Sequence, residues 1–479
     1  MNTILLQPTD VLFFRDGRPM EGSLAGHGAA WPLPNVTDAA FHAALHRSGL
    51  NGHSHDQRRG AERDGKDNRR FGSLITAGPF PVCVENKSKD RQLEKPIWFF
   101  PRPLDLLDGT LRPALLPTET NGRAHSSLPQ PLKYPVANTL PPTKEARAKA
   151  WLSAAAYAAY LTNDQPDPSH PSDLPDSLDD SAFFDTEATI GIAIDPATGT
   201  TGRGDADGKI YSAHYLRLRE GWRLGVFAKT AEKNGGLGRA DLIRDLLNRP
   251  CQILVGGQQR LCTATRIQED ALPLPRGKTS QFNQHNGAWL VKWILLSPAI
   301  WPEIQANEQK GVPHHPGGWL PNWVRQSDGQ VMLRTGQRQR RSYNGKHTRG
   351  YAGDAKEIAA KLVAAIVPKP IPVTGWALPN DADRPEGGAK STHLAVPAGA
   401  VYYFEADSAE AAAHLAAALN WHGPLVNPSD PADPANYTTI RNRRSTLLGE
   451  KGFGLGVCGT WQFYRPDPSD RSHPSDPSA

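Results

Sequence analysis

Two arginines flank a tight turn near the start of the chain, and their chemistry suits an anion. Residues 12–19 read L-F-F-R-D-G-R-P, so Arg15 and Arg18 stand on either side of Asp16 and Gly17. Aspartate and glycine favour a tight turn. Two guanidinium groups beside exposed loop amides suit phosphate oxygens. An ordinary surface turn with solvated arginines is the alternative, and local chemistry does not exclude it.

A second candidate is the glycine-rich segment near the other end. Residues 452–459 read G-F-G-L-G-V-C-G, and Gly454, Gly456 and Gly459 have the spacing G-x-G-x-x-G. A dinucleotide fingerprint needs a helix next, whereas T-W-Q-F-Y here leads into a Pro/Asp-rich tail. The segment is either a weakened strand end or a bare backbone, with Gly452, that a phosphate chain approaches. The preceding cations favour a polyanion: Arg441, Arg443, Arg444 and Lys451.

The most basic window is 334–351. It contains no acidic residue, and Tyr343 and Tyr351 alternate with its cations, which include Arg338, Arg340 and Arg341. Such a segment suits a sugar-phosphate backbone with stacked bases. A solvated loop is the alternative.

Signals for catalysis are weak. The chain has 16 His, yet it contains no H-E-x-x-H, nucleophile elbow, Walker A motif or carboxylate cluster with metal spacing. His27 lies between Gly26 and Gly28 in the first loop and could act as a general base in metal-free RNA cleavage. A surface or capping role is the alternative. We therefore predict no catalytic residue, metal or cofactor, with RNA contacts in the first loop at Gly26, His27 and Gly28.

Composition indicates two domains in a reducing compartment. A chain of 479 residues exceeds the size of one growing core. The four cysteines form no C-x-x-C pair, so a disulfide framework is not expected and the cytoplasm is the simplest location. No apolar run is long enough to span a bilayer, and the first residues lack a secretory layout. The net charge of +5 does not by itself indicate a nucleic-acid binder.

Periodicity predicts the same element order twice. In the first half we expect a strand at 4–6, a helix at 37–47 capped by Asn35 or Thr37, and a hairpin of strands 211–219 and 222–229. A helix around 242–247 and strands 252–255 and 261–266 follow. An Ala-rich helix is expected at 144–161. This order, β-α-β-β-α-β, is the split βαβ or ferredoxin-like arrangement.

The second half repeats that order. We expect a strand at 289–296, a helix opened by Asp354 and Glu357 and carrying Ile358, Leu362 and Ile366, and strands at 373–377 and 400–406. A helix opened by Asp407 and Glu410 and a last strand at 453–463 complete the pattern. The predicted fold is α+β, with two tandem ferredoxin-like (RRM-like) domains and long loop insertions.

Several motifs together resemble one CRISPR-associated RAMP family, the type III-B effector subunit that caps the 5′ end of the crRNA. They are F-F-R-D-G-R-P at 13–19, G-I-A-I-D at 191–195, L-V-G-G-Q-Q-R at 254–260, A-V-P-A-G-A-V-Y-Y-F-E at 395–405 and G-F-G-L-G-V-C-G-T-W at 452–461. Gln258 departs from the family, where an acid often follows the glycine pair. Thr189 and His393-Leu394 stand where basic residues are common.

The resemblance implies two RAMP domains, at 1–285 with insertions near 51–70 and 163–181, and at 286–465 with the basic loop 334–351, followed by a disordered tail 466–479. It implies a non-catalytic, cytoplasmic subunit that binds the repeat-derived 5′ tag in antiviral defence. The partners would be the large palm-domain subunit and the backbone RAMP subunit, with no membrane. The opening motif and the closing glycines would lie near the tag. A metal-free RAMP endoribonuclease that processes precursor crRNA, and a pure protein scaffold, are the alternatives.

Overall fold

The fold was analysed in a computed structural model. It describes residues 1–14, 25–26, 31–48, 74–84, 96–106, 111–115, 127–139, 149–162, 177–192, 194–195, 197–201, 210–230, 241–335, 339–343, 346–350, 355–377 and 388–464. The predicted insertion 51–70, most of the predicted insertion 163–181 and the tail 466–479 lie outside these residues. No helix within the described ranges is long and apolar enough to cross a membrane.

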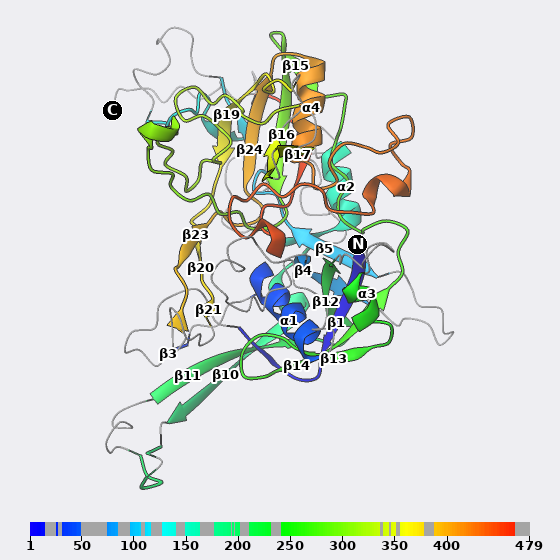
Figure 1. Ribbon diagram of the computed structural model, residues 1–479, viewed down its shortest axis with the longest axis vertical. Coiled ribbons are helices and arrows are strands. Elements are labelled where there is room, and N and C mark those ends of the chain that lie inside the picture. Colours follow the sequence, from blue (N-terminus) through cyan, green and yellow to red (C-terminus); the bar gives the residue numbers. More distant parts are fainter. Residues whose placement is uncertain are drawn as a thin grey trace, which may run out of the picture.

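The first half is built on one antiparallel sheet (Figure 1). Its strand order is β13 (Cys251–Leu254), β14 (Leu261–Ile267), β1 (Asn2–Pro8), β12 (Trp222–Lys229), β4 (Ile75–Cys83), β5 (Ile97–Pro101), β8 (Trp151–Ser153) and β9 (Ser177–Leu178). Helix α1 (Pro34–Arg47) connects β1 to β4, and α3 (Leu242–Leu246) connects β12 to β13. Ile4 and Leu6 of β1 share a buried cluster with Phe41 and Leu45 of α1 and Ile243 of α3. The apolar face of each helix therefore covers this sheet.

The predicted hairpin of strands 211–219 and 222–229 is wrong. Both strands exist, but β11 (Ile210–Leu218) pairs with β10 (Phe184–Ile192) and β2 (Leu12–Phe13), whereas β12 pairs with β1 and β4. Gly221 takes a φ of +81° where the chain passes from one sheet to the other. The turn signal predicted a change of direction correctly. It carried no information about pairing, because both edges of β12 are taken by strands distant in sequence.

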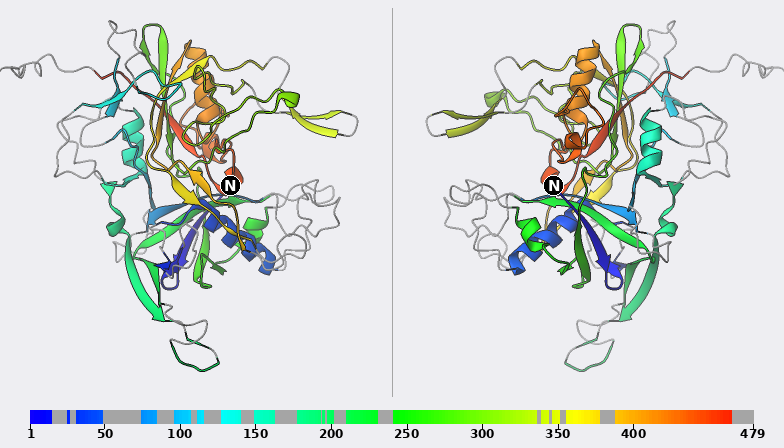
Figure 2. Two further views of the ribbon diagram at one scale, coloured as in Figure 1. Left: turned by 90° about the vertical axis from the view of Figure 1, so that its left-hand side faces the viewer. Right: turned by 90° about the vertical axis from the view of Figure 1, so that its right-hand side faces the viewer.

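Strands β10 and β11 extend as a hairpin from the body of the molecule (Figures 1 and 2). Strand β3 (Ala25–Gly26) runs parallel to part of β11. Ile190, Ile192 and Ile194 are 78%, 55% and 62% exposed along this hairpin.

The second half has its own antiparallel sheet. Strand β16 (Ala288–Leu295) lies between β24 (Val401–Ala406) on one side and β15 (Asn283–His285) and β25 (Gly456–Thr460) on the other, and β19 (Ala360–Ile366) lies beyond β24. Helix α4 (Ala409–Leu419) connects β24 to β25. The Ser408 hydroxyl caps it by accepting a hydrogen bond from the Ala411 amide at 3.0 Å. Leu415 and Leu419 are buried, as the predicted helix stripe requires.

Two other predicted helices are also corrected. The segment with Ile358, Leu362 and Ile366 is not a helix but contains β19. Leu362 packs in one hydrophobic cluster and Val363 in another, so adjacent residues are buried on opposite faces of the strand. A strand buried on both faces shows no clean alternation, and its apolar spacing imitated a helix. In the Ala-rich segment 144–161, residues 151–153 form β8 and only α2 (Ala154–Thr162) is helical. Helix α1 begins after Leu33, with no side-chain cap.

Short elements complete the structure. They are β6 (Leu111–Pro113), β7 (Val136–Asn138), β17 (Gln339–Tyr343), β18 (Lys346–Gly350), β20 (Ile371–Val373), β21 (Trp376–Ala377), β22 (Gly388–Ala389), β23 (His393–Ala395), and the 3-10 turns at 180–182, 308–310, 434–437 and 449–451. The halves meet in one hydrophobic cluster, in which Trp98 and Phe227 of the first half join Ile294, Val457 and Trp461 of the second.

Candidate nucleic-acid interface

The opening motif begins in strand β2, where Phe13 pairs with Tyr215 of β11. Phe14 is buried, and the described chain stops there. Arg15, Asp16, Gly17 and Arg18 lie outside the described residues, as do His27 and Gly28. Gly26 is the last residue of β3 and pairs with Ala213 of β11.

A second sequence motif packs directly against this strand. The Gly257 amide donates a hydrogen bond to the Phe13 carbonyl at 2.9 Å. Gly256 has a φ of +78°, and a Cβ there would lie 2.5 Å from the same carbonyl oxygen. Only glycine permits this approach. The motifs at 12–14 and 254–260, which are distant in the sequence, are therefore neighbours in space.

The turn then continues through two strained residues. Gln258 and Gln259 have φ values of 54° and 53°, in the left-handed region. A non-glycine residue pays roughly 1–2 kcal/mol for that conformation. Both side chains are exposed. Such strain persists only where the surrounding structure holds it, and it occurs often at ligand-binding sites.

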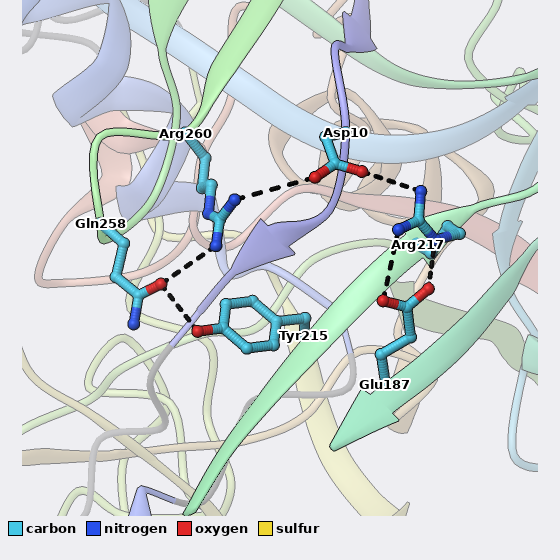
Figure 3. Close-up of polar contacts among 6 residues, drawn as sticks. All are labelled: Asp10, Glu187, Tyr215, Arg217, Gln258 and Arg260. Atoms are coloured by element: carbon cyan, nitrogen blue, oxygen red, sulfur yellow. Dashed lines mark hydrogen bonds and ion pairs between the residues drawn. The ribbon is translucent and has the colours of Figure 1, made fainter. Parts of the chain in front are cut away.

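A polar cluster surrounds this turn (Figure 3). It consists of Asp10, Glu187, Tyr215, Arg217, Gln258 and Arg260. Arg217 bridges two acids: its Nη1 is 2.9 Å from Asp10 Oδ1, and its Nε bonds to Glu187. Arg260 Nη1 lies 3.9 Å from Asp10 Oδ2. Two arginines thus face two carboxylates, and the cluster is close to charge balance.

Tyr215 is the centre of the cluster. Its hydroxyl donates to Gln258 Oε1 at 2.9 Å, and Arg260 Nη2 donates to the same oxygen at 3.2 Å. The Arg260 guanidinium lies over the tyrosine ring, 5.0 Å from its centroid, and the Phe13 ring packs at 5.5 Å.

None of these six residues was predicted as a site residue, although Gln258 and Arg260 belong to the quoted motif at 254–260. Two signals were available: the Gly-Gly pair before Gln258, and the alternation that puts Tyr215 and Arg217 on one face of a strand. Neither indicated which distant carboxylates would meet them.

The arginines before the closing glycines have different surroundings. Arg444 is anchored, because its Nε donates to the Ala418 carbonyl at 2.6 Å and its Nη2 to Asn442 at 3.3 Å. That carbonyl belongs to the last turn of α4, where a cation is favourable. Arg441 is exposed and bonds to the Pro424 carbonyl at 3.1 Å.

Arg443 is the least satisfied of the three. Its Nε and Nη2 are shielded from solvent and have no hydrogen-bond partner in the described part of the chain. Its Nη1 makes one long bond, 3.4 Å, to the Ile440 carbonyl. Burial lowers the pKa of Arg443 to about 10, despite the nearby Glu450.

Lys451 fastens the closing segment to the first half of the chain. Its Nζ lies 3.2 Å from Asp38 of α1. Burial raises the pKa of Asp38, and Lys451 opposes that effect only in part. The next residue, Gly452, would place a Cβ 2.7 Å from Ala77 Cα in β4. The segment at Lys451 and Gly452 therefore rests on α1 and β4.

All four closing glycines are buried against the protein's own atoms. A Cβ on Gly454 would lie 2.1 Å from the Ser445 amide nitrogen, and one on Gly456 would lie 2.3 Å from Trp293 Nε1. A Cβ on Gly459 would lie 3.1 Å from Lys292 Cε. Close internal packing therefore accounts for these glycines without a ligand.

The basic window forms a separate feature. Arg340 and Arg341 belong to β17, which pairs with β18, and Arg340 is opposite Arg349. Arg338 lies outside the described residues. This hairpin projects from the body, well away from β10 and β11 (Figure 2). The structure thus brings Phe13 and Phe14 of the opening motif to the 254–260 turn, and it places the described part of the basic window, β17 and β18, away from both.

No group of three or more His, Cys, Asp or Glu among the described residues is arranged to hold a metal ion. The candidate interface itself contains hydrogen-bond donors, aromatic rings, two arginines and two carboxylates.

Comparisons with known proteins identify a family. A family model described as CRISPR-associated protein (Cas_Cmr3) matches residues 4–461. A structure of Type III-B Cmr-beta bound to cognate target RNA and AMPPnP is 13% identical, with a TM-score of 0.36, over 84% of this chain and 86% of that one. A second, bound to cognate target RNA, is 12% identical with a TM-score of 0.35 and the same coverage. A Csm3-Csm4 subcomplex of a type III-A CRISPR-Cas interference complex is 10% identical, with a TM-score of 0.31, over 84% and 92%. No curated protein sequence matches.

Proposed function

Since the chain belongs to the family of CRISPR-associated proteins described as Cas_Cmr3, which confirms the resemblance seen in its motifs, we propose that it is a non-catalytic crRNA-binding subunit of a type III-B effector complex. In this role it recognises the repeat-derived 5′ tag in antiviral defence, in the cytoplasm. It joins the large palm-domain subunit to the backbone RAMP subunits.

The strand orders support two ferredoxin-like RAMP domains. In the first half, β1, β4, β12 and β14 lie in the spatial order β14-β1-β12-β4, and in the second, β16, β19, β24 and β25 lie in the order β25-β16-β24-β19. Numbered along the chain, both orders are 4-1-3-2, the order of a split βαβ. Helices α3 and α4 occupy the same connection in the two halves. The boundary we propose lies between β14 and β15, close to the 285/286 boundary expected from sequence.

The observation that carries the RNA-binding proposal is the packing of the 254–260 turn on Phe13, at the point where the described chain leads to Arg15. Two exposed glutamines in the left-handed conformation lie there, and the residues that follow Phe14 along the chain include Arg15 and Arg18. Single-stranded RNA is recognised by such groups: polar side chains and loop amides contact bases, and arginines contact phosphates.

The test is binding of tagged and untagged RNA to the purified chain, or to the assembled complex if the chain is insoluble alone. We expect tighter binding of tagged RNA. Changing Arg15 and Arg18 together to Ala should lower affinity and reduce the salt slope by about 1.4, because each phosphate contact on a single strand contributes about 0.7.

The control carries the same change in charge at two other exposed arginines, Arg249→Ala with Arg325→Ala, and should bind as the parent does. Equal affinity for tagged and untagged RNA would refute tag recognition. Cleavage of repeat RNA in the presence of chelator, abolished by His27→Ala, would instead support the metal-free endoribonuclease.

A further inference from the structure

The amide of Gln258 has a defined orientation. An arginine has hydrogen-bond donors only, so the Gln258 atom that faces Arg260 Nη2 at 3.2 Å must be the carbonyl oxygen. The Tyr215 hydroxyl bonds to the same oxygen. The amide nitrogen therefore points away from both partners, as Figure 3 shows, on an exposed side chain.

The cluster around this amide does not favour a phosphate. Arg217 is held between Asp10 and Glu187, and Arg260 shares Asp10. The aromatic ring is also occupied, because Arg260 covers Tyr215 and Phe13 packs against it. The group left for a ligand is a neutral N–H donor. A neutral donor suits a carbonyl oxygen.

The backbone conformation indicates a role for the Gln258 side chain, because a glutamine is strained at this position. Glycine would occupy the left-handed conformation of residue 258 without strain, and glycine already stands at 256 and 257. The turn is nevertheless fixed, because Val255 donates to the Arg260 carbonyl at 2.8 Å and Gly257 donates to Phe13. A glutamine held in this way is a pre-organised donor.

We propose that Gln258 recognises a base of the guide RNA by donating an amide hydrogen bond to a carbonyl oxygen on an unpaired base. The inference rests on the proposed function and specifies the chemistry of its recognition. The Gln258 amide can donate to guanine O6 or to uracil O4. It cannot donate to the amino group that adenine or cytosine carries at the equivalent position. Because the donor is neutral, this contact adds base preference without salt dependence.

The experiment measures affinity for a panel of tagged RNAs in which each tag position is changed between keto and amino bases (G to A, U to C). For the parent protein, we expect one position where the keto base binds about fivefold tighter, the value of one neutral hydrogen bond. Gln258→Glu keeps the shape but replaces the donor by an acceptor, so the preference at that position should disappear or invert. Gln258→Ala should abolish it with an unchanged salt slope.

Gln259→Glu is the matched control, because it makes the same charge change at an exposed neighbour in the same backbone conformation. It should keep the keto preference. A Gln258→Glu protein that retains the parent's preference at every position overturns the proposal, as does equal loss in the control. If Gln258→Glu weakens complex assembly but leaves base preference intact, the acceptor belongs to a protein and the proposal is also overturned.

The two proposals fail in different ways. If the parent protein does not distinguish tagged from untagged RNA, both the proposed function and the role of Gln258 are refuted. If the parent distinguishes them and the Gln258 variants keep its base preference, only the role of Gln258 is refuted.

Discussion

Adjacent arginines 443 and 444 should respond in opposite directions to the same substitution. Methionine matches the length of the apolar stem of arginine but lacks the guanidinium group with its charge and donors. Arg444 uses those donors on the last turn of α4, at 2.6 Å from the Ala418 carbonyl. The shielded Nε and Nη2 of Arg443 have no partner in the described part of the chain. We therefore expect Arg444→Met to destabilise the fold and Arg443→Met to stabilise it.

The magnitudes follow from these environments. Burial lowers the pKa of Arg443 to about 10. That is roughly two units below an exposed arginine and corresponds to a cost of about 3 kcal/mol for keeping the charge. Replacing a poorly compensated buried ion by an apolar side chain recovers about 1–3 kcal/mol. For Arg444, the loss of charged hydrogen bonds costs about 2 kcal/mol and leaves the Ala418 carbonyl without this donor.

The pH dependence has a definite sign. The folded pKa of Arg443 is lowered, so both folded and unfolded states are protonated below about pH 10, and the cost is fully present there. The cost is relieved only as pH rises through the folded pKa. The stability difference between Arg443→Met and the parent should therefore be constant from about pH 6 to 9.

Urea unfolding midpoints at several pH values measure this prediction. Equal destabilisation by the two variants would refute the reasoning, because Arg443 would then have partners like those of Arg444. RNA affinity of the same proteins tests the expected contact at Arg443. A stabilised variant with weaker RNA binding supports a role in the interface, and a stabilised variant with parental binding assigns Arg443 to the fold alone.

Two further predictions concern packing within the second sheet and the ion pair that joins the two halves. Gly456→Ala places a Cβ 2.3 Å from Trp293 Nε1 and should cost about 2 kcal/mol or more of stability. The control Gly375→Ala places its Cβ 3.4 Å from the flexible Lys390 side chain and should change the urea midpoint little. Similar midpoints for both variants would contradict close packing at Gly456. Lys292→Met breaks a buried pair with Asp105 at 2.8 Å and should cost about 3–5 kcal/mol in thermal or urea unfolding. Adding Asp105→Asn removes the unpaired charge and keeps an acceptor for the buried Tyr160 hydroxyl, so it should restore part of that loss; a double variant no better than the single one would argue against the pair.

The outcome of the secondary-structure predictions depended on how local each signal was. Helix α4 could be predicted because its stripe of Leu415 and Leu419 lies within one segment, although its cap is Ser408 and not the expected Asp407. Strand β16 was equally clear as an apolar run interrupted by Lys292 alone. The segment 354–366 was wrongly predicted as a helix, because both faces of β19 are buried and such a strand shows no alternation of apolar and polar residues.

The sequence alone determined the element types with local signals, the family motifs and the glycines that permit close approach. Only the tertiary structure decided which strands pair, and it separated β11 from β12 although one turn joins them. It also assembled Asp10, Glu187, Arg217 and Arg260 into one balanced cluster. The physical reason is that pairing and charge compensation depend on residues far apart in the chain, whose proximity results from burial of the sheets and appears in no single window of sequence.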